Sequence, residues 1–496
     1  MVENILFYGD CLEILRGAGM DATPYIDSES VDLIYLDPPF NSERVYNVIF
    51  SEPDGSGARS QIKGFDDTWT WNDDVAREYV EIKNMGGRLA DTIVGLERML
   101  GFCNLFAYLV MMTTRLVELR RVLKQTGSLY LHCDHTAGHY IKVVLDGVFG
   151  PNCFKNEIIW HYGLGAANVK DKFRSKHDTI FWYVKSKKYY FSGLRGEPTD
   201  AQLKKYCHED GGGKYMMSYG KKYYFKGGAI LDDVWDIPTL SPTSSERLGY
   251  PTQKPEALLE RIILASSRPG DVVLDPFCGC GTAIAVAEKL GRTWMGIDIT
   301  AIAINVIKSR LSDSFPDSGY RVIGEPVTTE DAARLAESDD PNARFQFQLW
   351  ALGLDGARPA GQKLKKGADK GVDGKRYFVS PRGTELIVYS VKSGKVSSRD
   401  VRDLARVVER ENAAIGVFIS LKDITRAMKE EAASAGVYNP MALDGGTYPR
   451  VQLLTISEML AGKSVQWPRF LKDVTYKTAP REKREPATAP KQLRVD

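Results

Sequence analysis

The pattern of apolar and polar positions changes abruptly near residue 37. A continuous apolar run, Leu33 to Leu36, predicts a strand that is buried on both faces of a sheet. An acid, two prolines and an aromatic residue follow at positions 37–40. Two consecutive prolines donate no backbone hydrogen bond and restrict φ, so the chain must leave the sheet in one stiff conformation. The pattern therefore predicts a rigid turn at the carboxyl end of a strand, where open α/β sheets bind ligands.

Two side chains of this turn indicate a kind of chemistry. Asp37 offers an acceptor for an amino group, and Phe40 offers an aromatic face on which a flat ring can stack. Together they suit a planar substrate that carries an exocyclic amine. An ordinary strand followed by a proline turn would give the same local pattern, and that is the structural alternative.

A second buried strand far downstream favours the functional interpretation. Residues 272–274 are apolar, and a glycine-punctuated loop over 275–282 precedes a predicted helix over 283–290. A further strand, 293–297, ends in Asp298. The glycines let a ligand approach the backbone, and the acid suits ribose hydroxyls. Because the loop matches neither a phosphate loop nor a G-x-G-x-x-G fingerprint, we expect a nucleoside ligand without a pyrophosphate, which points to S-adenosylmethionine.

Periodicity predicts further elements around these two segments. Strands are expected over residues 4–8, 128–133 and 177–185, and helices over residues 74–84, 103–123 and 256–266. The helix over 103–123 is apolar on most sides, so we expect it to be buried against a sheet.

With these motifs the chain resembles the amino-methylating DNA methyltransferases of the β arrangement, in which an Asp-Pro-Pro-aromatic motif precedes the cofactor loop. Residues 8–12 resemble the amino-terminal cofactor motif of that family, and residues 127–134 resemble a strand that follows the catalytic motif. Residues 251–255 are similar to the lead-in to the cofactor loop. The motifs occur in the order of the family and span residues 1–310.

The resemblance implies an α/β fold with a Rossmann-like methyltransferase sheet over residues 1–310, S-adenosylmethionine as the cofactor and DNA as the substrate. It implies catalytic roles for Asp37, Pro38, Pro39 and Phe40. It also implies that Asp10 accepts the amino group of the cofactor's adenine. The full set of implied cofactor-binding residues is Asp10, Thr252, Lys254, Asp275, Phe277, Gly279, Gly281, Thr282 and Asp298.

The chemistry of an aromatic amine explains why these residue types are needed. The amine is a poor nucleophile because its lone pair is delocalised into the ring. The carboxylate of Asp37 and the carbonyl of Pro38 can accept its two hydrogens, which frees the lone pair to attack a sulfonium methyl group. A base inside a duplex must be flipped out to reach them, with Phe40 stacked on it. The acid at position 37 favours adenine N6, with cytosine N4 as the alternative; related motifs also serve RNA and protein-glutamine methylation.

Composition limits the class of protein. The 496 residues are too many for one ordinary core and predict two or three domains. A net charge of +2 excludes a global polycation, so any surface for nucleic acid must come from local segregation of charge. No apolar run approaches the length of a membrane span, and seven scattered cysteines are typical of reduced thiols. We therefore expect a cytoplasmic protein with no membrane partner.

Charge is segregated between residues 155 and 235, a window with 15 Lys and Arg, 9 Asp and Glu, and 16 aromatic residues. Basic groups neutralise phosphates and aromatic side chains stack on bases, although a β-rich insertion with solvated lysines is the structural alternative. The resembling family carries its target-recognition region here. We therefore expect residues 186–245 to bind double-stranded DNA, through Lys187, Lys188, Lys221 and Lys222.

The six histidines all fall between positions 132 and 208. The spacing of His132, His135 and His139 could indicate a metal site. However, His132 lies in a predicted strand and His135 in the turn after it, so the three need not share a face. Amino methylation also requires no metal, and we expect none here.

A smaller α/β domain is predicted beyond the methyltransferase region. Turn-forming clusters over residues 311–342 predict a linker, and helices and strands alternate over residues 343–470. Their order resembles the Mrr-like branch of the PD-(D/E)xK nucleases, in which Asp373 would bind a metal ion and Lys392 would be the catalytic lysine. Ser390 stands where Glu or Gln is usual, so the resemblance implies at most weak binding of Mg²⁺.

Residues 471–496 are predicted to be a disordered tail because they are rich in charge and proline. The sequence leaves two questions open. The protein could form a homodimer. Its carboxyl-terminal domain could either only bind DNA or cleave it, in which case the chain would be a combined restriction-modification protein.

Overall fold

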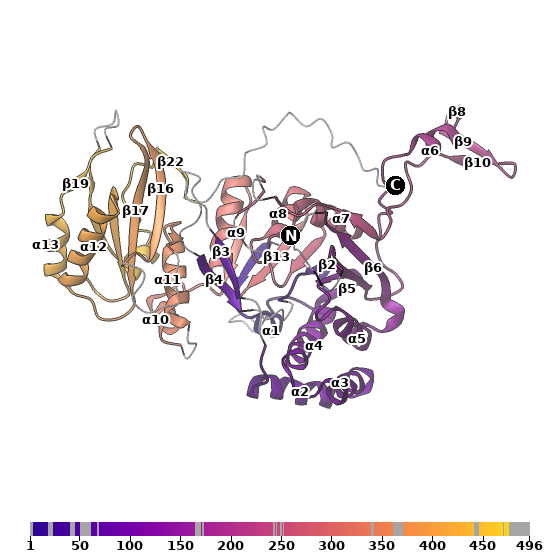
Figure 1. Ribbon diagram of the computed structural model, residues 1–496, viewed down its shortest axis with the longest axis horizontal. Coiled ribbons are helices and arrows are strands. Elements are labelled where there is room, and N and C mark those ends of the chain that lie inside the picture. The colour runs from indigo at the N-terminus through magenta and orange to yellow at the C-terminus, as the bar shows by residue number, and fades with distance from the viewer. Residues whose placement is uncertain are drawn as a thin grey trace.

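A computed structural model gives the fold, and its described residues form two α/β domains (Figure 1). The described residues are 3–17, 23–39, 45–49, 61–66, 69–163, 170, 173–241, 244, 246–248, 250, 252–338, 342–360, 371–440, 446–469 and 471–475. Phe40, the predicted stacking residue, lies outside them. Within these ranges, no helix is long and apolar enough to cross a membrane.

A sheet of nine strands, counted over the described residues, forms the centre of the first domain. Its spatial order is β11-β6-β7-β5-β2-β12-β13-β1-β14. The strands are β1 (Asn4–Tyr8), β2 (Val31–Leu36), β5 (Leu123–Cys133), β6 (Phe154–His161), β7 (His177–Val184), β11 (Val234–Asp236), β12 (Val272–Asp275), β13 (Thr293–Asp298) and β14 (Tyr320–Ile323). β7 runs antiparallel to β5 and β6, whereas β1, β2, β5, β12 and β13 are parallel. The parallel strands therefore bring their carboxyl ends to one edge.

Alternate side chains of the strands pack into two cores, one on each face of the sheet. Ile34 and Leu36 pack with α1 (Cys11–Arg16), α4 (Asn104–Val122) and α5 (Gly138–Phe149). Leu33 and Tyr35 pack on the opposite face with α7 (Glu256–Ser266), α8 (Thr282–Lys289) and α9 (Ala301–Ser314). The uninterrupted apolar run thus reflects burial on both faces. The predicted Rossmann-like α/β sheet is confirmed.

Further elements surround this sheet. Helices α2 (Asp73–Met85) and α3 (Gly87–Leu100) pack against α4 and α5, below the sheet in Figure 1. A short 3-10 helix, Pro151–Cys153, precedes β6. Strands β3 (Val45–Ile49) and β4 (Gln61–Asp66) form a separate antiparallel pair.

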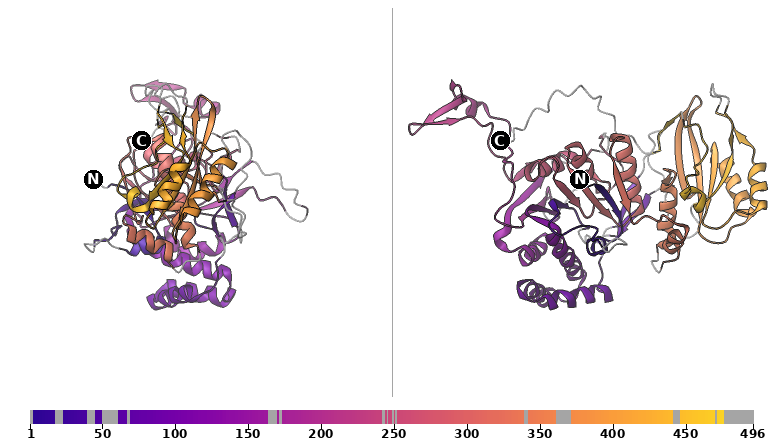
Figure 2. Two further views of the ribbon diagram at one scale, coloured as in Figure 1. Left: turned by 90° about the vertical axis from the view of Figure 1, so that its left-hand side faces the viewer. Right: turned by 180° about the vertical axis from the view of Figure 1, so that it is seen from behind.

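An arm projects from the sheet between β7 and β11 (Figures 1 and 2). It consists of α6 (Asp200–Lys205), β8 (His208–Asp210), β9 (Gly213–Ser218) and β10 (Lys221–Tyr224). The amide of Ser192, at its base, donates to the carbonyl of Ala265 at the end of α7. β11 then rejoins the sheet beside β6 and buries Trp235. The insert predicted over 186–245 is therefore too long, because its last part returns to the core.

In the described part of the second domain, six strands form a mixed sheet in the order β15-β16-β17-β18-β21, with β22 beside β16. The strands are β15 (Arg358–Pro359), β16 (Gly374–Ser380), β17 (Gly383–Lys392), β18 (Ile415–Ser420), β21 (Val451–Thr455) and β22 (Lys472–Asp473). Helices α12 (Ser398–Arg410) and α13 (Arg426–Ser434) cover one face, and α11 (Ala343–Gly353) covers the other. α14 (Ile456–Leu460) and a short hairpin, β19 (Val437–Tyr438) with β20 (Tyr448–Pro449), complete the domain.

The linker predicted over residues 311–342 is wrong. α9 continues to Ser314, and β14 pairs with β1 as an edge strand of the large sheet. α10 (Thr329–Glu337) packs on α11, and α11 packs on α9. The turn-forming clusters that suggested a linker are the short connections between these packed elements.

One apolar cluster joins the two domains. Its members at the boundary are Ala301, Ile302, Val306, Ala332, Ala336, Phe347, Trp350 and Leu352. The side-chain amide of Asn305 also donates to the carbonyl of Leu349 at 2.9 Å. A Cβ on Gly353 would lie 2.1 Å from Oδ1 of Asn305, so the close approach of α9 and α11 requires glycine there. The two domains are therefore packed together.

The predicted tail also needs a correction. Lys472–Asp473 forms β22, which pairs with β16 through Val379 and Phe378. Residues 471–475 thus belong to the second domain, and the remainder of the predicted tail, 476–496, lies outside the described residues.

Candidate active site

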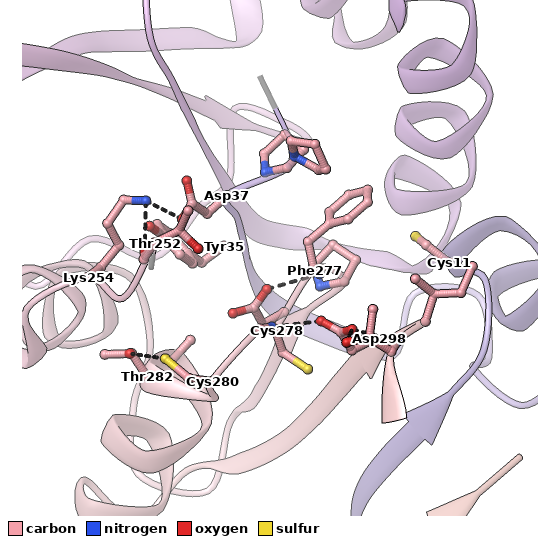
Figure 3. A pocket seen from close by; sticks show the side chains of 18 of the residues that line it. Cys11, Tyr35, Asp37, Thr252, Lys254, Phe277, Cys278, Cys280, Thr282 and Asp298 are labelled. Carbon is pink, nitrogen blue, oxygen red and sulfur yellow. Dashed lines mark hydrogen bonds and ion pairs between the residues drawn. The ribbon is translucent and has the colours of Figure 1, made fainter. Parts of the chain in front are cut away.

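A pocket of about 230 Å³ opens at the carboxyl ends of β1, β2, β12 and β13 (Figure 3). The sequence-predicted residues that line it are Asp10, Asp37, Pro38, Pro39, Thr252, Lys254, Asp275, Phe277, Gly279, Thr282 and Asp298. Gly281 lies beside the pocket at the start of α8, with φ at +73°. A Cβ there would lie 2.8 Å from Cγ1 of Ile307, so both the backbone and the packing favour glycine.

Asp37 lines the part of this pocket that is expected to receive the substrate. Its Oδ2 accepts a hydrogen bond from the ammonium group of Lys254 (Figure 3). Its Oδ1 is buried, and among the described residues no group donates a hydrogen bond to it. Lys254 was predicted as a cofactor contact, but in the structure its charge is directed at the predicted catalytic carboxylate. Oδ1 is thus the oxygen of Asp37 with acceptor capacity left.

A chain of polar groups lies behind Asp37. Nδ1 of His132 is 3.8 Å from Oδ1 of Asp37 and 3.2 Å from the hydroxyl of Tyr35. Nε2 of His132 is 3.3 Å from Oδ2 of Asp178, whose Oδ1 accepts from the hydroxyl of Tyr162 at 3.2 Å. Burial alone would raise the pKa of Asp178, but the hydrogen bond and charge of His132 bring that pKa below its ordinary value. Asp178 is therefore ionised at neutral pH.

The cofactor end is built around the glycine loop. Oδ2 of Asp298 accepts from the amide of Gly279 at 2.9 Å, and its Oδ1 accepts from Thr300. Asp298, predicted to bind ribose, thus also fixes the loop. Burial raises the pKa of Asp298. Burial and the nearby charges of Asp37 and Asp298 also raise the pKa of Asp275 well above its ordinary value.

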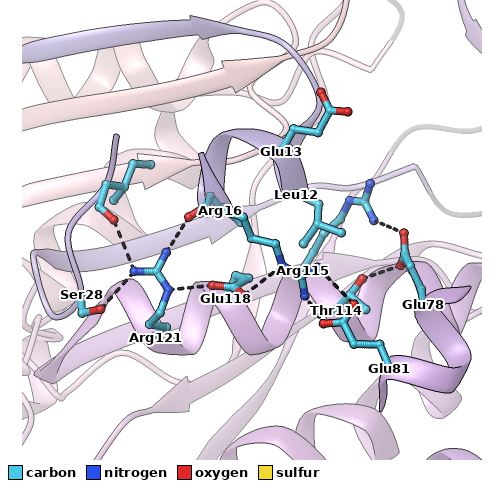
Figure 4. A network of polar contacts seen from close by, with 12 residues as sticks. Leu12, Glu13, Arg16, Ser28, Glu78, Glu81, Thr114, Arg115, Glu118 and Arg121 are labelled. Carbon is cyan, nitrogen blue, oxygen red and sulfur yellow. Dashed lines mark hydrogen bonds and ion pairs between the residues drawn. The ribbon is translucent and has the colours of Figure 1, made fainter. Parts of the chain in front are cut away.

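Asp10 sits at the start of α1 and is held from two sides. Its Oδ1 accepts from the amides of Leu12 and Glu13 and caps the helix. Its Oδ2 accepts from the buried guanidinium of Arg115 at 2.8 Å. Arg115 belongs to a wider polar network that joins α1, α2 and α4 (Figure 4). Asp10 can therefore accept a hydrogen bond from the adenine amino group only through the lone pairs that these bonds do not use.

The charges of the pocket fit S-adenosylmethionine, the cofactor that the resemblance implies. Asp10 and Asp37 are paired with Arg115 and Lys254. Asp275 and Asp298 also line the pocket, and within the described ranges neither has an ion-pair partner. A ligand that carries a positive sulfur and an ammonium group suits two such carboxylates, because it stabilises their ionised form. The partly exposed ring of Phe277 adds a surface for stacking.

Comparison with protein families decides the class. Residues 31–309, more than half of the chain, match the family model described as DNA methylase. The chain belongs to this family. Residues 348–447 match a second family model, described as restriction endonuclease.

Two curated relatives cover the methylase part. The DNA adenine methyltransferase YhdJ of Escherichia coli (strain K12) is 29% identical over 312 residues, which span 62% of this chain and 85% of the relative. The Type II methyltransferase M.HinfI of Haemophilus influenzae is 28% identical over 328 residues, 63% of this chain and 70% of the relative. The solved M1.HpyAVI–SAM complex matches with 20% identity and a TM-score of 0.34, over 62% of this chain and 98% of that structure.

Sequence reasoning missed several residues of this DNA methylase's pocket. Tyr250 and Arg115 line it, and His132 and Asp178 lie behind it. Tyr250 directly precedes the recognised lead-in at 251–255, whereas the other three come from segments far from both motifs and are brought to the pocket only by the fold. The histidine at position 132, in an otherwise apolar strand, could have indicated a buried polar site. Its spacing to His135 suggested a metal site instead. Among the described residues, no group of three or more His, Cys, Asp or Glu side chains is arranged to hold a metal ion.

The four lysines predicted to contact DNA are exposed but differ in setting. Lys187 and Lys188 follow β7 next to Gln125, at the sheet edge opposite the pocket. Lys221 and Lys222 lie on β10 of the arm. In the β9–β10 pair, Lys222 shares a face with Met217 and forms an ion pair with Asp210.

The nuclease-like residues meet at the end of β17. Oδ2 of Asp373 accepts from the amide of Val391 at 2.7 Å and from the hydroxyl of Ser390 at 3.4 Å. The ammonium group of Lys392 is 3.7 Å from the same oxygen. The predicted pairing of Asp373 with Lys392 is therefore present in space. Ser390, a neutral hydroxyl, lies beside Asp373, and among the described residues no group of three or more His, Cys, Asp or Glu side chains is arranged to hold a metal ion.

Proposed function

We propose that this DNA methylase transfers a methyl group from S-adenosylmethionine to N6 of adenine in double-stranded DNA. The observation that carries the proposal is Asp37, a carboxylate fixed by a Pro-Pro turn and by Lys254, with one oxygen that has acceptor capacity. S-adenosylmethionine supplies a methyl group on a positively charged sulfur.

Each residue of the turn has a separate part in the proposal. Oδ1 of Asp37 and the carbonyl of Pro38 accept the two hydrogens of the target amine, so that its lone pair is released from the ring. Pro39 keeps the turn rigid, and Phe40 stacks on the flipped base. Lys254 orients the carboxylate by holding Oδ2. The opposite end of the pocket, with Asp275, Phe277 and Asp298, binds the cofactor.

Adenine is the preferred target for two reasons. The acid at position 37 is the residue that favours adenine in such motifs. Of the two relatives YhdJ and M.HinfI, YhdJ is named as a DNA adenine methyltransferase. Cytosine N4 is the alternative, because it presents a similar amine to the same acceptors.

The arm is the proposed contact to DNA outside the pocket. Residues 213–226 contain four lysines and no acidic residue. The strand pairing places Lys221, Met216 and Tyr223 on one face of the hairpin, opposite the face that holds Lys222 and Asp210. Lysine beside an aromatic ring suits a phosphate next to a base. A cytoplasmic location and a homodimer belong to the same proposal as expectations from the sequence.

For the second domain, binding of DNA is favoured over cleavage. The match to a restriction endonuclease family supports contact with DNA. Ser390 places a neutral hydroxyl beside Asp373 where a carboxylate would help to hold a metal ion, which argues against efficient cleavage.

Product analysis tests the proposed function. The protein is expressed in a host whose DNA lacks methylation, and the nucleosides of its digested DNA are separated by mass spectrometry. N6-methyladenine is expected in the wild type and absent with Asp37→Ala. N4-methylcytosine alone would support the alternative, and no methylated nucleoside would contradict both.

A further inference from the structure

Methylation of an amine releases a proton, and the structure around Asp37 bears on where that proton goes. The target nitrogen gains one methyl group and loses one proton, while the departing sulfur keeps the electron pair of the bond that breaks. A group in the site that accepts the proton assists the reaction. Several side chains near Asp37 are candidates.

Most of these candidates are poor acceptors. Lys254 already carries its proton, since it is paired with Asp37. Burial raises the pKa of the Cys278 and Cys280 thiols, which therefore stay protonated. Asp37 itself can take the proton first, but it must lose that proton again before the next turnover. A proton on Asp37 therefore needs an acceptor beyond it.

His132 is placed to be that acceptor. It is fully buried in β5, and its Nδ1 lies 3.8 Å from Oδ1 of Asp37. Tyr35 faces it from β2 and Asp37 from the turn that follows β2. Asp178 faces it from β7, and the ring of Trp160 meets it edge-on from β6. Burial and the charge of Asp37 raise the pKa of Tyr35 well above its ordinary value, so the phenol keeps its proton and donates it toward Nδ1.

The far side of the ring fixes the tautomer. Asp178 is ionised and can only accept, so Nε2 of His132 carries hydrogen, and the remaining nitrogen, Nδ1, presents its lone pair. A carboxylate behind an imidazole holds the ring and stabilises the imidazolium that forms when it takes a proton. The exposed fraction of the Asp178 side chain is 19%, against 0% for His132. The chain thus leads from the pocket toward solvent.

We propose that Nδ1 of His132 receives, through Oδ1 of Asp37, the proton that the target amine loses on methylation. The proton leaves the nitrogen for Oδ1 of Asp37 and then binds Nδ1, whose hydrogen bond from Tyr35 is given up. Asp178 stabilises the imidazolium, and the proton returns to solvent after turnover. The inference rests on the proposed role of Asp37, through which His132 acts.

Nuclear magnetic resonance of the resting protein tests the tautomer without any reaction. Full-length protein is labelled with ¹⁵N in its six histidines, and His132→Gln assigns the resonance of residue 132. At neutral pH we expect one ring nitrogen that carries hydrogen, Nε2, and an unprotonated Nδ1. Hydrogen on Nδ1 would overturn the proposal, because that nitrogen would then donate to Asp37 and accept nothing.

Single-turnover kinetics test the role itself. His132→Gln should slow transfer on the order of 10²-fold, with unchanged affinity for S-adenosylmethionine. Asp178→Asn keeps an acceptor for Nε2 but removes the charge, so it should cause a smaller loss of the same kind. His135→Gln, in the exposed turn after β5, is the matched control and should match the wild type.

The outcomes separate this inference from the proposed function. Wild-type rates in His132→Gln and Asp178→Asn, with an inactive Asp37→Ala, would overturn the role of His132 and leave the proposed function standing. Activity in Asp37→Ala would remove the basis of both. If His132→Gln fails to fold, the transfer rate of Asp178→Asn still decides, because that variant keeps the imidazole and changes only the charge behind it.

Discussion

The ammonium group of Lys254 donates a hydrogen bond to Oδ2 of Asp37, although 217 positions separate the two residues in the chain. Both side chains are mostly buried, with exposed fractions of 12% and 15%. The two recognised motifs of the methylase, the Pro-Pro turn and the lead-in to the cofactor loop, thus meet at one carboxylate. Lys254 fixes one oxygen of Asp37 and leaves the other for the proposed role of acceptor for the substrate amine.

Replacement of Lys254 by methionine should therefore slow methyl transfer more than it weakens cofactor binding. The loss of a charged hydrogen bond to a mostly buried carboxylate costs about 1.5–3 kcal/mol, which corresponds to a fall of about 10- to 100-fold in rate. Lys254→Arg keeps the charge and should lose less. Single-turnover rates and calorimetry with S-adenosylmethionine measure the two effects. The role first predicted from the sequence, a cofactor contact, requires the opposite result, with weakened binding and a nearly unchanged rate.

On the arm, Lys221→Gln should weaken binding to DNA of any sequence and reduce the dependence of log affinity on log salt by about one. Within the described residues, the Lys221 side chain has no ion-pair partner. The matched control is Lys222→Gln combined with Asp210→Asn, which removes the ion pair on the other face without a change in net charge. Gel-shift titrations at several salt concentrations compare them. An unchanged slope for Lys221→Gln would show that no phosphate binds there.

A chain that ends at Asp313 should be less stable than the whole protein. A linker over residues 311–342, as predicted from the sequence, would leave the methylase domain of such a chain intact, but the structure shows that the chain would lose β14 and uncover the apolar face of α9. Each large apolar side chain exposed costs about 1.5–3 kcal/mol. Thermal unfolding followed by circular dichroism should give a lower midpoint, or the protein should precipitate. A soluble fragment with the midpoint of the full chain would show that the shared cluster does not stabilise the methylase domain.

Several features could be predicted because their determinants are local. The Pro-Pro turn, the glycine loop and helix α7, which matches the predicted bounds of 256–266, depend on residues that are adjacent in the chain. The continuous apolar run 33–36 is also a local feature, and such a run indicates a strand that is buried on both faces of a sheet. Those elements positioned most of the predicted cofactor residues around one pocket.

The remaining features depend on which strands become neighbours. His132 meets Asp178 because β5 and β7 pair, and it meets Asp37 because β5 and β2 pair. No local pattern encodes those pairings. The supposed linker failed for a related reason: Ala332 and Ala336 are small residues in a polar helix, and their burial depends on a partner from another domain.

The second domain should cleave plasmid DNA slowly at most, in magnesium or manganese. Asp373 already accepts from Ser390 and Val391 and lies 3.7 Å from Lys392, while Ser390 offers only a neutral hydroxyl where a carboxylate would help to hold a metal. Ser390→Glu should increase cleavage, and Lys392→Ala should remove whatever cleavage the wild type shows. Rapid cutting by the wild type that survives Lys392→Ala would place the nuclease elsewhere.

The most direct measurement of the central claim is the rate of methyl transfer by Asp37→Ala in a single turnover, with cofactor affinity measured in parallel. The account predicts that transfer to unmethylated DNA falls by about 10²- to 10³-fold, because the amine loses its main acceptor, an effect comparable to the loss of a transition-state hydrogen-bond partner. The dissociation constant for S-adenosylmethionine should stay close to that of the wild type, since the residues proposed to hold the cofactor, Asp275, Phe277 and Asp298, line the other end of the pocket. Transfer by Asp37→Ala at the wild-type rate would contradict the account.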